Sequence, residues 1–168
     1  MIAAAFAAGR QQIKGALVPR EALAYPAGSM NPDQVLHLAI QLPVRNKAEL
    51  DRSLANIYDP KSPEYGHYLT PQEYALRFGT SQADYNALAA FFKKKGFKVT
   101  ISQNRLLLDI EGKVKNVENT FHVSLRLYKN PLEKRDFYAP DREPSLDTDI
   151  PVANIAGLDN FRKAHPLN

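Results

Sequence analysis

Strict alternation of apolar and polar residues at Val35–Leu42 (VLHLAIQL) constrains the fold of this chain more than any other feature. The apolar side carries Leu36, Leu38, Ile40 and Leu42. A period of two is typical of a β-strand with one buried face. A single half-buried strand cannot cover itself, so the chain must build a sheet with a packed layer on one side.

The same alternation returns three times, which predicts three further strands. The expected strands are Phe97–Ile101, Arg105–Ile110 and Val123–Tyr128. The side chains expected to point inward are Phe97, Val99 and Ile101, then Leu106, Leu108 and Ile110, then Val123, Leu125 and Leu127. The turn signal Gln103-Asn104 joins the first two of these strands into a β-hairpin.

Helical periodicity fills the gaps between the strands. The predicted helices are Lys47–Tyr58, Pro71–Phe78, Gln82–Lys95 and Val114–Phe121. The first has Asn46 as its expected N-cap and a buried stripe of Leu50, Leu54 and Ile57. Thr70, Pro71 and Glu73 form the capping-box pattern at the start of the second. The expected buried sides of the last two helices carry Tyr85, Leu88, Ala89 and Phe92, then Val114, Val117 and Phe121.

The order of these elements predicts an α+β fold. Without the inserted helices it is the ferredoxin-like split β-α-β arrangement, an antiparallel four-stranded sheet with helices on one face. Residues 35–161 would form this domain, and residues 1–34 an extended N-terminal arm because Pro19, Pro26 and Pro32 interrupt any period. Asp136–Pro140 is a candidate edge strand and Ile150–Leu158 should dock back. The segment from Phe161 onward should be exposed, with 162–168 as the start of a linker.

Composition excludes several classes of protein. The chain has no cysteine, which rules out disulfides, thiolate metal sites and cysteine nucleophiles. Its 22 Lys and Arg against 18 Asp and Glu give a mild net charge of +4, which does not by itself call for nucleic acid. No apolar run approaches the roughly 20 residues that span a bilayer, so no membrane partner is expected. Met1–Ala8 is either a frayed helix or the remnant of a signal peptide.

No catalytic or metal-binding constellation is present in the sequence. The histidines are His37, His67, His122 and His165, and none has the spacing of a metal site or a neighbouring nucleophile motif. The eight glycines are scattered singly, so there is no phosphate-binding loop. We therefore expect no enzymatic activity, no catalytic residue and no cofactor in this chain.

The face of the sheet turned away from the helices is the candidate functional surface. By alternation it would present His37, Gln41, Lys98, Thr100, Arg105, Leu107, Asp109, Ser124, Arg126 and Tyr128. This mixed, mostly polar surface fits a protein-binding face, and it equally fits a solvated face of an antiparallel sheet.

A stand-alone binding module, for protein or for nucleic acid, is the alternative function. Ferredoxin-like sheets also build the RNA-recognition module, and Lys95-Gly96-Phe97 matches the start of its strand motif. The match ends there, because Phe97 should point into the core and Tyr128 is the only aromatic residue expected on the open face. We expect no nucleic-acid partner.

Several short motifs, in order, resemble the activation domain of the sedolisin or kumamolisin-like serine-carboxyl peptidases. They are Ser62-Pro63, His67–Pro71, Arg77-Phe78-Gly79, Gly96-Phe97, Asn104–Leu107, Val117-Glu118 with Phe121, Pro144-Ser145-Leu146 and Gly157–Phe161. None of these motifs is specific alone, but their order and spacing over most of the chain are.

The resemblance implies a ferredoxin-like propeptide similar in plan to those of subtilisin-like enzymes. In the family this domain precedes a secreted peptidase with a Ser-Glu-Asp catalytic set and a calcium site. It assists folding of the peptidase, blocks its cleft and is removed at acidic pH. The peptidase, its catalytic residues and its calcium ligands have no counterpart in these 168 residues. The implied partner is therefore a cognate sedolisin-type peptidase domain, in a secreted precursor.

Overall fold

The computed structural model describes residues 9–130 and 133–162, and places three antiparallel sheets beside four α-helices. The α+β fold class predicted from the sequence is confirmed. The largest sheet has the strand order β4-β5-β3-β9. Its strands are β3 (Val35–Gln41), β4 (Lys98–Ile101), β5 (Leu107–Lys113) and β9 (Asn154–Ala156).

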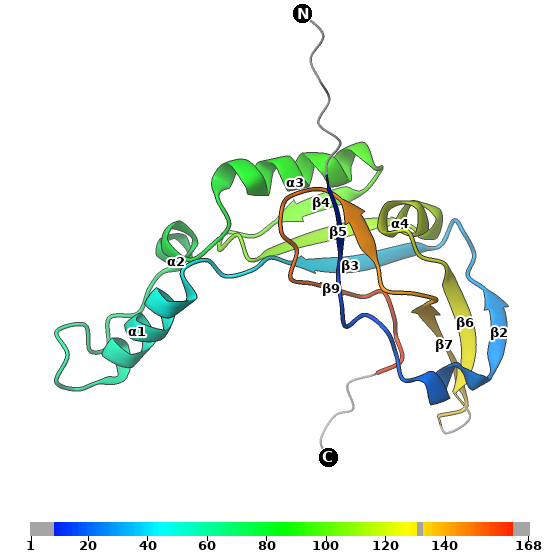
Figure 1. Ribbon diagram of the computed structural model, residues 1–168, viewed down its shortest axis with the longest axis horizontal. Coiled ribbons are helices and arrows are strands. Elements are labelled where there is room, and N and C mark those ends of the chain that lie inside the picture. The colour runs from blue at the N-terminus through cyan, green and yellow to red at the C-terminus, as the bar shows by residue number, and fades with distance from the viewer. Residues whose placement is uncertain (1–8, 131–132, 163–168) are drawn as a thin grey trace, which may run out of the picture.

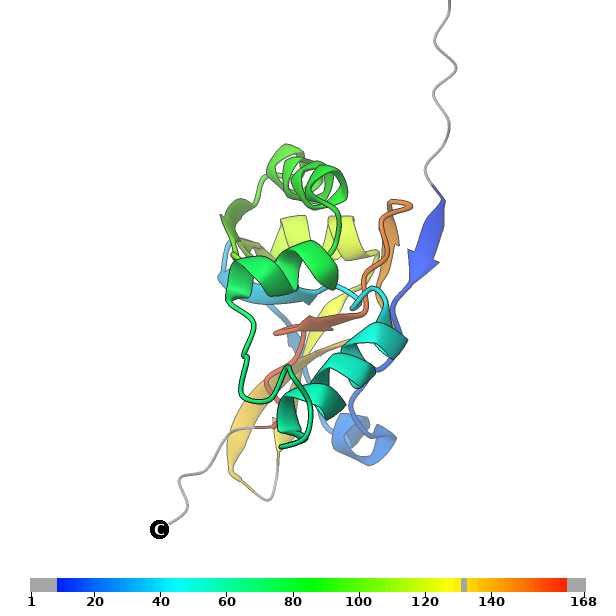
Figure 2. The same ribbon diagram turned by 90° about the vertical axis from the view of Figure 1, so that its left-hand side faces the viewer.

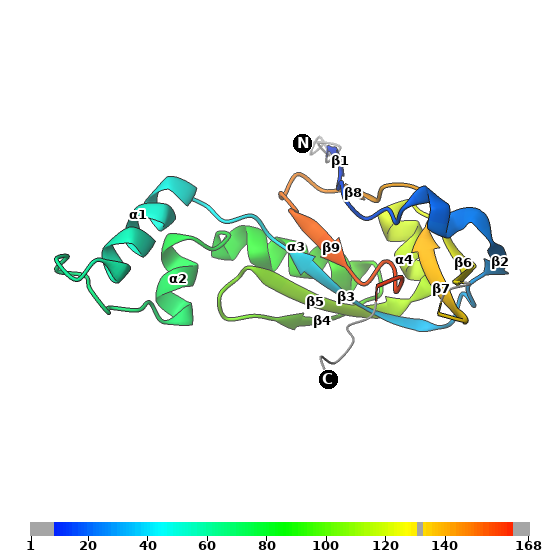
Figure 3. The same ribbon diagram turned by 90° about the horizontal axis from the view of Figure 1, so that it is seen from below.

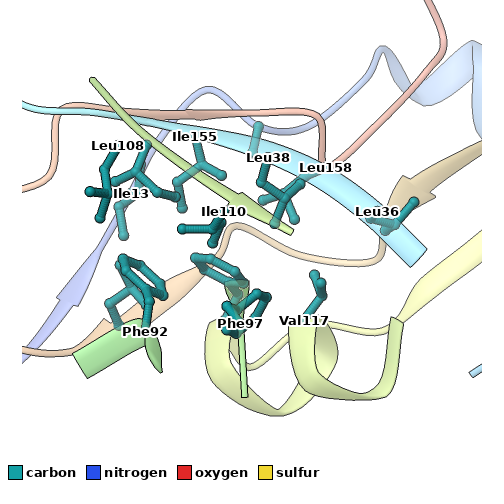
Figure 4. Packing of buried hydrophobic residues seen from close by; sticks show 14 of the residues in the cluster. Ile13, Leu36, Leu38, Phe92, Phe97, Leu108, Ile110, Val117, Ile155 and Leu158 are labelled. Atoms are coloured by element: carbon teal, nitrogen blue, oxygen red, sulfur yellow. The ribbon is translucent and has the colours of Figure 1, made fainter. Parts of the chain in front are cut away.

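One face of this sheet is covered by helices α3 (Gln82–Lys94) and α4 (Val114–Phe121), as Figure 1 shows. The expected inward residues of β3 and β5, among them Leu38 and Ile110, are buried against Phe92 of α3 and Val117 of α4 (Figure 4). Fully burying one such side chain stabilises the fold by roughly 1.5–3 kcal/mol. Ile101, also expected inward, is instead 66% exposed, because it ends the edge strand β4 where no described element covers it.

The fourth predicted strand joins a different sheet, which corrects the sequence-based topology. β6 (Leu125–Asn130) pairs with β2 (Pro26–Ser29) and with β7 (Arg135–Pro140). A ferredoxin-like sheet would place this strand beside β3. Here β6 pairs with β2, the strand that directly precedes β3. The short strand β9 pairs with the C-terminal part of β3, at Ala39–Gln41.

The N-terminal arm is extended but docks along the domain. β1 (Arg10–Gln12) pairs with β8 (Ser145–Asp147), and the 3-10 helix η1 (Arg20–Ala24) follows. Three apolar side chains of the arm are buried in the main core: Ile13, Ala16 and Met30. Residues 1–8, where the sequence allows a helix or a signal-peptide remnant, lie outside the described residues.

Helices α1 (Lys47–Tyr58) and α2 (Pro71–Arg77) form a lobe that projects from one end of the large sheet (Figures 1 and 3). The capping box at Thr70 and Glu73 is confirmed, with Glu73 N–H donating to the Thr70 hydroxyl at 3.2 Å. The expected cap at Asn46 is wrong. Its backbone is left-handed (φ 52°), and its side chain donates to the Arg77 carbonyl instead.

The buried side of α1 also differs from the prediction. Ile57 is buried together with Ser53, whose hydroxyl accepts a hydrogen bond from Arg77 at 2.7 Å. Leu54, expected in the same stripe, is 45% exposed. The predicted and observed buried sides share Ile57 and the half-buried Leu50, and they differ where Ser53 is buried instead of Leu54. Sequence periodicity therefore located the helix and Ile57 correctly, but it misplaced Leu54.

Carboxylates hold the N-terminal arm in place. Asp147 accepts hydrogen bonds from Arg10 Nε at 2.7 Å and lies 2.9 Å from His122 Nε2. Glu143 accepts from the backbone N–H groups of Gly15 and Ala16, each at 3.0 Å. The Arg10 guanidinium, with a smaller contribution from His122, holds the pKa of the Asp147 carboxyl below its usual value.

Replacing Asp147 with asparagine should therefore destabilise the chain in a pH-dependent way. Because the pKa is lowered in the folded state, the stabilisation is present above the usual value of 3.8 and is lost as the pH falls through the lowered folded value. The pair is half exposed, so we expect a loss of at most about 1 kcal/mol at neutral pH. Denaturant unfolding of both proteins from pH 7 down to pH 2 measures this. A stability difference that stays constant across that range would contradict the assignment.

Candidate functional site

The open face of the large sheet is a continuous surface on the side away from α3 and α4. Six of the predicted site residues lie on it together: His37, Gln41, Lys98, Thr100, Leu107 and Asp109. The strand register sets their places, since Ala39 faces Asp109 across the β3–β5 pair and Thr100 faces Asp109 across the β4–β5 pair. We call this surface the open sheet face.

Arg105 does not lie on the open sheet face, which corrects the prediction. It precedes β5 in the turn, with a left-handed backbone (φ 52°). Its side chain instead donates to the Gln82 side chain at 3.0 Å and to the Ala75 carbonyl. Arg105 therefore fastens the lobe to the domain.

Two more predicted residues, Arg126 and Tyr128, lie in the second sheet because β6 does not join the first, and Ser124 directly precedes β6. Arg126 is exposed there and donates to the Ser29 hydroxyl of β2 at 2.6 Å, while Ser124 N–H donates to Asp141 at 2.7 Å. Tyr128 is 8% exposed and stacks on Phe137, with ring centroids 5.5 Å apart. Among the described residues, the open sheet face consequently carries no Phe, Tyr or Trp on which a nucleic-acid base could stack.

Sequence reasoning missed part of the open sheet face. Glu111 of β5 lies beyond the predicted end of that strand, and β9 adds Asn154 and Ala156 at the edge. β9 has only three residues, so its alternation was too short to be recognised. The signal for Glu111 was available, because it continues the period of Leu107 and Asp109.

The centre of the open sheet face is a shallow depression of about 260 Å³. It is lined by His37, Leu38, Ala39, Lys98, Thr100, Asp109, Ile110 and Glu111. Ala39 has a small side chain, which leaves this space open between the longer polar side chains that surround it. The surface can thus admit a protruding side chain of a partner protein.

Charges on the open sheet face are unevenly paired. Glu111 lies 3.8 Å from His37 Nδ1 and 3.6 Å from Lys98 Nζ. Asp109 forms no ion pair with any residue that the structure describes, although it is exposed in the middle of the face. A partner cation could therefore pair with Asp109 without displacing an existing contact.

A buried tyrosine supports the hairpin beneath this surface. Tyr85 of α3 is 1% exposed, and its hydroxyl donates to the Leu107 carbonyl at 2.6 Å. The same hydroxyl accepts a hydrogen bond from Ser102 N–H at 2.7 Å. Burial raises the pKa of the Tyr85 hydroxyl, and the nearby Asp109 charge adds to this. The neutral hydroxyl fixes both strands of the β4–β5 hairpin to the helix.

The open sheet face lies between two projecting parts of the chain. Figures 1 and 2 show α1 on the side of the sheet opposite α3 and α4, and Figure 1 shows the β2-β6-β7 sheet descending at the far end. The face is seen in full from below in Figure 3.

The C-terminal motif Gly157–Phe161 ties the chain to the second sheet. Leu158 is buried in the main core, and the Asn160 side chain accepts a hydrogen bond from Tyr138 N–H at 2.7 Å. Phe161, expected to be exposed, is half-buried against Phe137 with ring centroids 5.0 Å apart. Arg135 of β7 donates to the Asn160 carbonyl at 3.0 Å. Residues 163–168 of the expected linker lie outside the described residues.

Within residues 9–130 and 133–162, no group of three or more His, Cys, Asp or Glu side chains could hold a metal ion. No helix among these residues is both long and apolar enough to span a bilayer.

Comparison with known families identifies the family of this chain. The sequence profile described as "Pro-kumamolisin, activation domain" matches residues 24–161, most of the chain. This chain belongs to the pro-kumamolisin activation-domain family. The match includes β2, which the sequence analysis assigned to the arm, so the domain boundary at residue 34 stays a prediction.

Two characterised relatives match the same region. Xanthomonalisin from Xanthomonas sp. (strain T-22) is 29% identical over 143 residues, which cover 83% of this chain and 17% of that protein. Sedolisin from Pseudomonas sp. (strain 101) is 25% identical over 147 residues, covering 86% of this chain and 25% of that protein. The chain thus spans a quarter or less of the length of these relatives. Membership of the activation-domain family gives the chain a propeptide role.

Proposed function

We propose that this chain is the propeptide of a secreted sedolisin-type serine peptidase. It helps the peptidase to fold and keeps it inhibited until the propeptide is removed at acidic pH. The open sheet face supports this proposal, because it is an exposed, mostly polar surface with a shallow depression and with Asp109, a carboxylate that has no ion pair among the described residues. Binding the native peptidase but not its unfolded chain would lower the free energy of the folded peptidase by mass action. A standard interface of roughly 1,600 Å² is adequate for tight inhibition.

An inhibition assay with the separately produced cognate peptidase domain tests the proposal. We expect the 168-residue chain to inhibit that domain stoichiometrically at neutral pH and to lose its effect in acid. Binding should tolerate moderate salt, whereas binding to a polyanion would fall steeply with salt concentration. Absence of inhibition at every pH would refute the inhibitory role, and salt-sensitive RNA binding instead would favour the nucleic-acid-binding alternative.

Asp109 is the proposed acid-sensitive contact of the open sheet face. At neutral pH its carboxylate would pair with a cation of the peptidase, and protonation in acid would remove that attraction. The other charged groups near it are His37, Lys98 and Glu111, with the Tyr85 hydroxyl beneath.

Replacing Asp109 with asparagine should flatten the pH dependence of inhibition. We expect about tenfold weaker inhibition at neutral pH, the loss of one charged pair, and a smaller further loss in acid than for the unchanged chain. Inhibition constants from pH 7.5 to pH 3 measure both effects. Asp136→Asn, on the exposed edge of β7, is the matched control. An unaltered pH profile in the Asp109 variant would remove this residue from the switch.

A further inference from the structure

An apolar stripe on α1 is exposed to solvent except at the half-buried Leu50, although the sequence pattern predicts burial of Leu50 and Leu54. It consists of Leu50, Leu54 and Tyr58, spaced four residues apart, together with Tyr68 of the following loop. Leu54 is 45% exposed, Tyr58 68% and Tyr68 70%. The Tyr58 and Tyr68 rings meet edge to face with centroids 6.5 Å apart. We call these four side chains the aromatic stripe.

The contacts of the lobe explain why the stripe is free. The side of α1 that meets α2 is anchored by polar contacts, since Arg77 donates to Glu49 at 2.9 Å and to Ser53 at 2.7 Å. Ile57 completes that buried side. The contact between the two helices is largely polar, whereas the outer side of α1 is apolar. This is the reverse of the usual arrangement for an isolated pair of helices. Such a surface is typical of a contact with another protein.

We propose that the aromatic stripe is a second docking surface for the same peptidase domain, separate from the open sheet face. This rests on the proposed function. Two observations favour this occupant. The relatives have three quarters or more of their length outside the matched region, which is ample chain to reach the lobe. In addition, α1 lies on the open side of the sheet, so a partner seated on the sheet extends toward the lobe (Figures 1 and 2).

The stripe itself carries no charge, so the complementary patch on the peptidase is apolar. Aromatic side chains are enriched where protein interfaces are strongest. The contact should therefore contribute affinity without the acid sensitivity proposed for Asp109. Inhibition would then depend on two surfaces, of which only the sheet responds to pH.

Paired glutamine substitutions test the proposal. Leu54→Gln with Tyr58→Gln removes the stripe while keeping a good helix former at each position. The control is Ala48→Gln with Ala55→Gln, two exposed alanines on the other side of α1. We expect the stripe variant to bind the cognate peptidase domain at least tenfold more weakly at neutral pH, with the same loss at each lower pH where binding is measurable. The control should bind as the unchanged chain does.

Each other outcome has a defined meaning. Equal binding by the stripe variant overturns the inference while leaving the proposed function in place. No binding by the unchanged chain overturns both. A dimer of the free chain in sedimentation that the stripe variant abolishes would assign the stripe to self-association and also overturn the inference. Tyr68→Gln, in the loop outside both helices, supplies a second variant if the double substitution unfolds α1.

Discussion

Replacing Ala39 with arginine is expected to abolish inhibition of the cognate peptidase domain while leaving the fold intact. Ala39 lies at the centre of the open sheet face, opposite Asp109 on β5 and Ala156 on β9. A long side chain there would fill the depression of about 260 Å³ and hold a partner away from the sheet. Pairing with Asp109 should keep the new charge compatible with folding.

We expect at least a hundredfold rise in the inhibition constant of this variant, equivalent to about 2.8 kcal/mol. Ala87→Arg is the matched control, because Ala87 is an exposed alanine on α3 on the opposite side of the sheet. Titration of the peptidase domain with each variant at neutral pH gives the result. Comparable inhibition by both arginine variants would contradict the assigned surface.

Replacing Gly157 with alanine should cause a large loss of stability. Gly157 follows β9 with a left-handed backbone (φ 94°), and a Cβ there would lie 2.4 Å from the His37 carbonyl oxygen of β3. The left-handed conformation alone costs a non-glycine residue roughly 1–2 kcal/mol. The overlap with a backbone atom must also push β9 away from the sheet. We expect a total loss of about 3 kcal/mol, which denaturant unfolding measures.

Gly15 separates these two contributions. It has nearly the same backbone angle (φ 92°), and nothing lies within 4 Å of the position of its Cβ. Gly15→Ala should therefore lose only the conformational part, about 1 kcal/mol. Equal losses in the two variants would show that the close approach of β9 to β3 is not what requires glycine at 157.

The sequence predicted those parts of the fold that depend on local periodicity. The alternation in Val35–Leu42 and the helical side containing Phe92 both identified core residues correctly, because one buried face dominates each element. The capping box at Thr70 was equally local. Each of these features depends on neighbours within a few residues, so the sequence contains the whole signal.

Features set by tertiary pairing could not be predicted in the same way. The strand containing Leu125 was found, but nothing in its alternation says that β2 rather than β3 is its partner. This single choice moved Tyr128 from the open sheet face into the second core, against Phe137. Likewise, the polar contacts of Arg77 turned α1 so that Leu54 faces solvent. Long-range partners decided each case.

Prediction of the candidate site shows the same difference between local periodicity and long-range strand pairing. His37, Lys98 and Asp109 were placed on one face because they belong to strands that do pair as expected. Arg105 was misplaced by two residues of strand length, since β5 begins only at Leu107 after a left-handed turn. Their assignment to a peptidase interface remains a prediction for all of them.

Side-chain footprinting of the complex tests the central claim most directly. Hydroxyl-radical labelling of the free chain and of its complex with the cognate peptidase domain would compare His37 and Leu107 of the open sheet face with Tyr25, which is 56% exposed beside η1. We predict that labelling of His37 and Leu107 falls severalfold in the complex while Tyr25 is unchanged. Protection of Tyr25 with undiminished labelling of His37 and Leu107 would contradict the claim that this sheet face meets the peptidase.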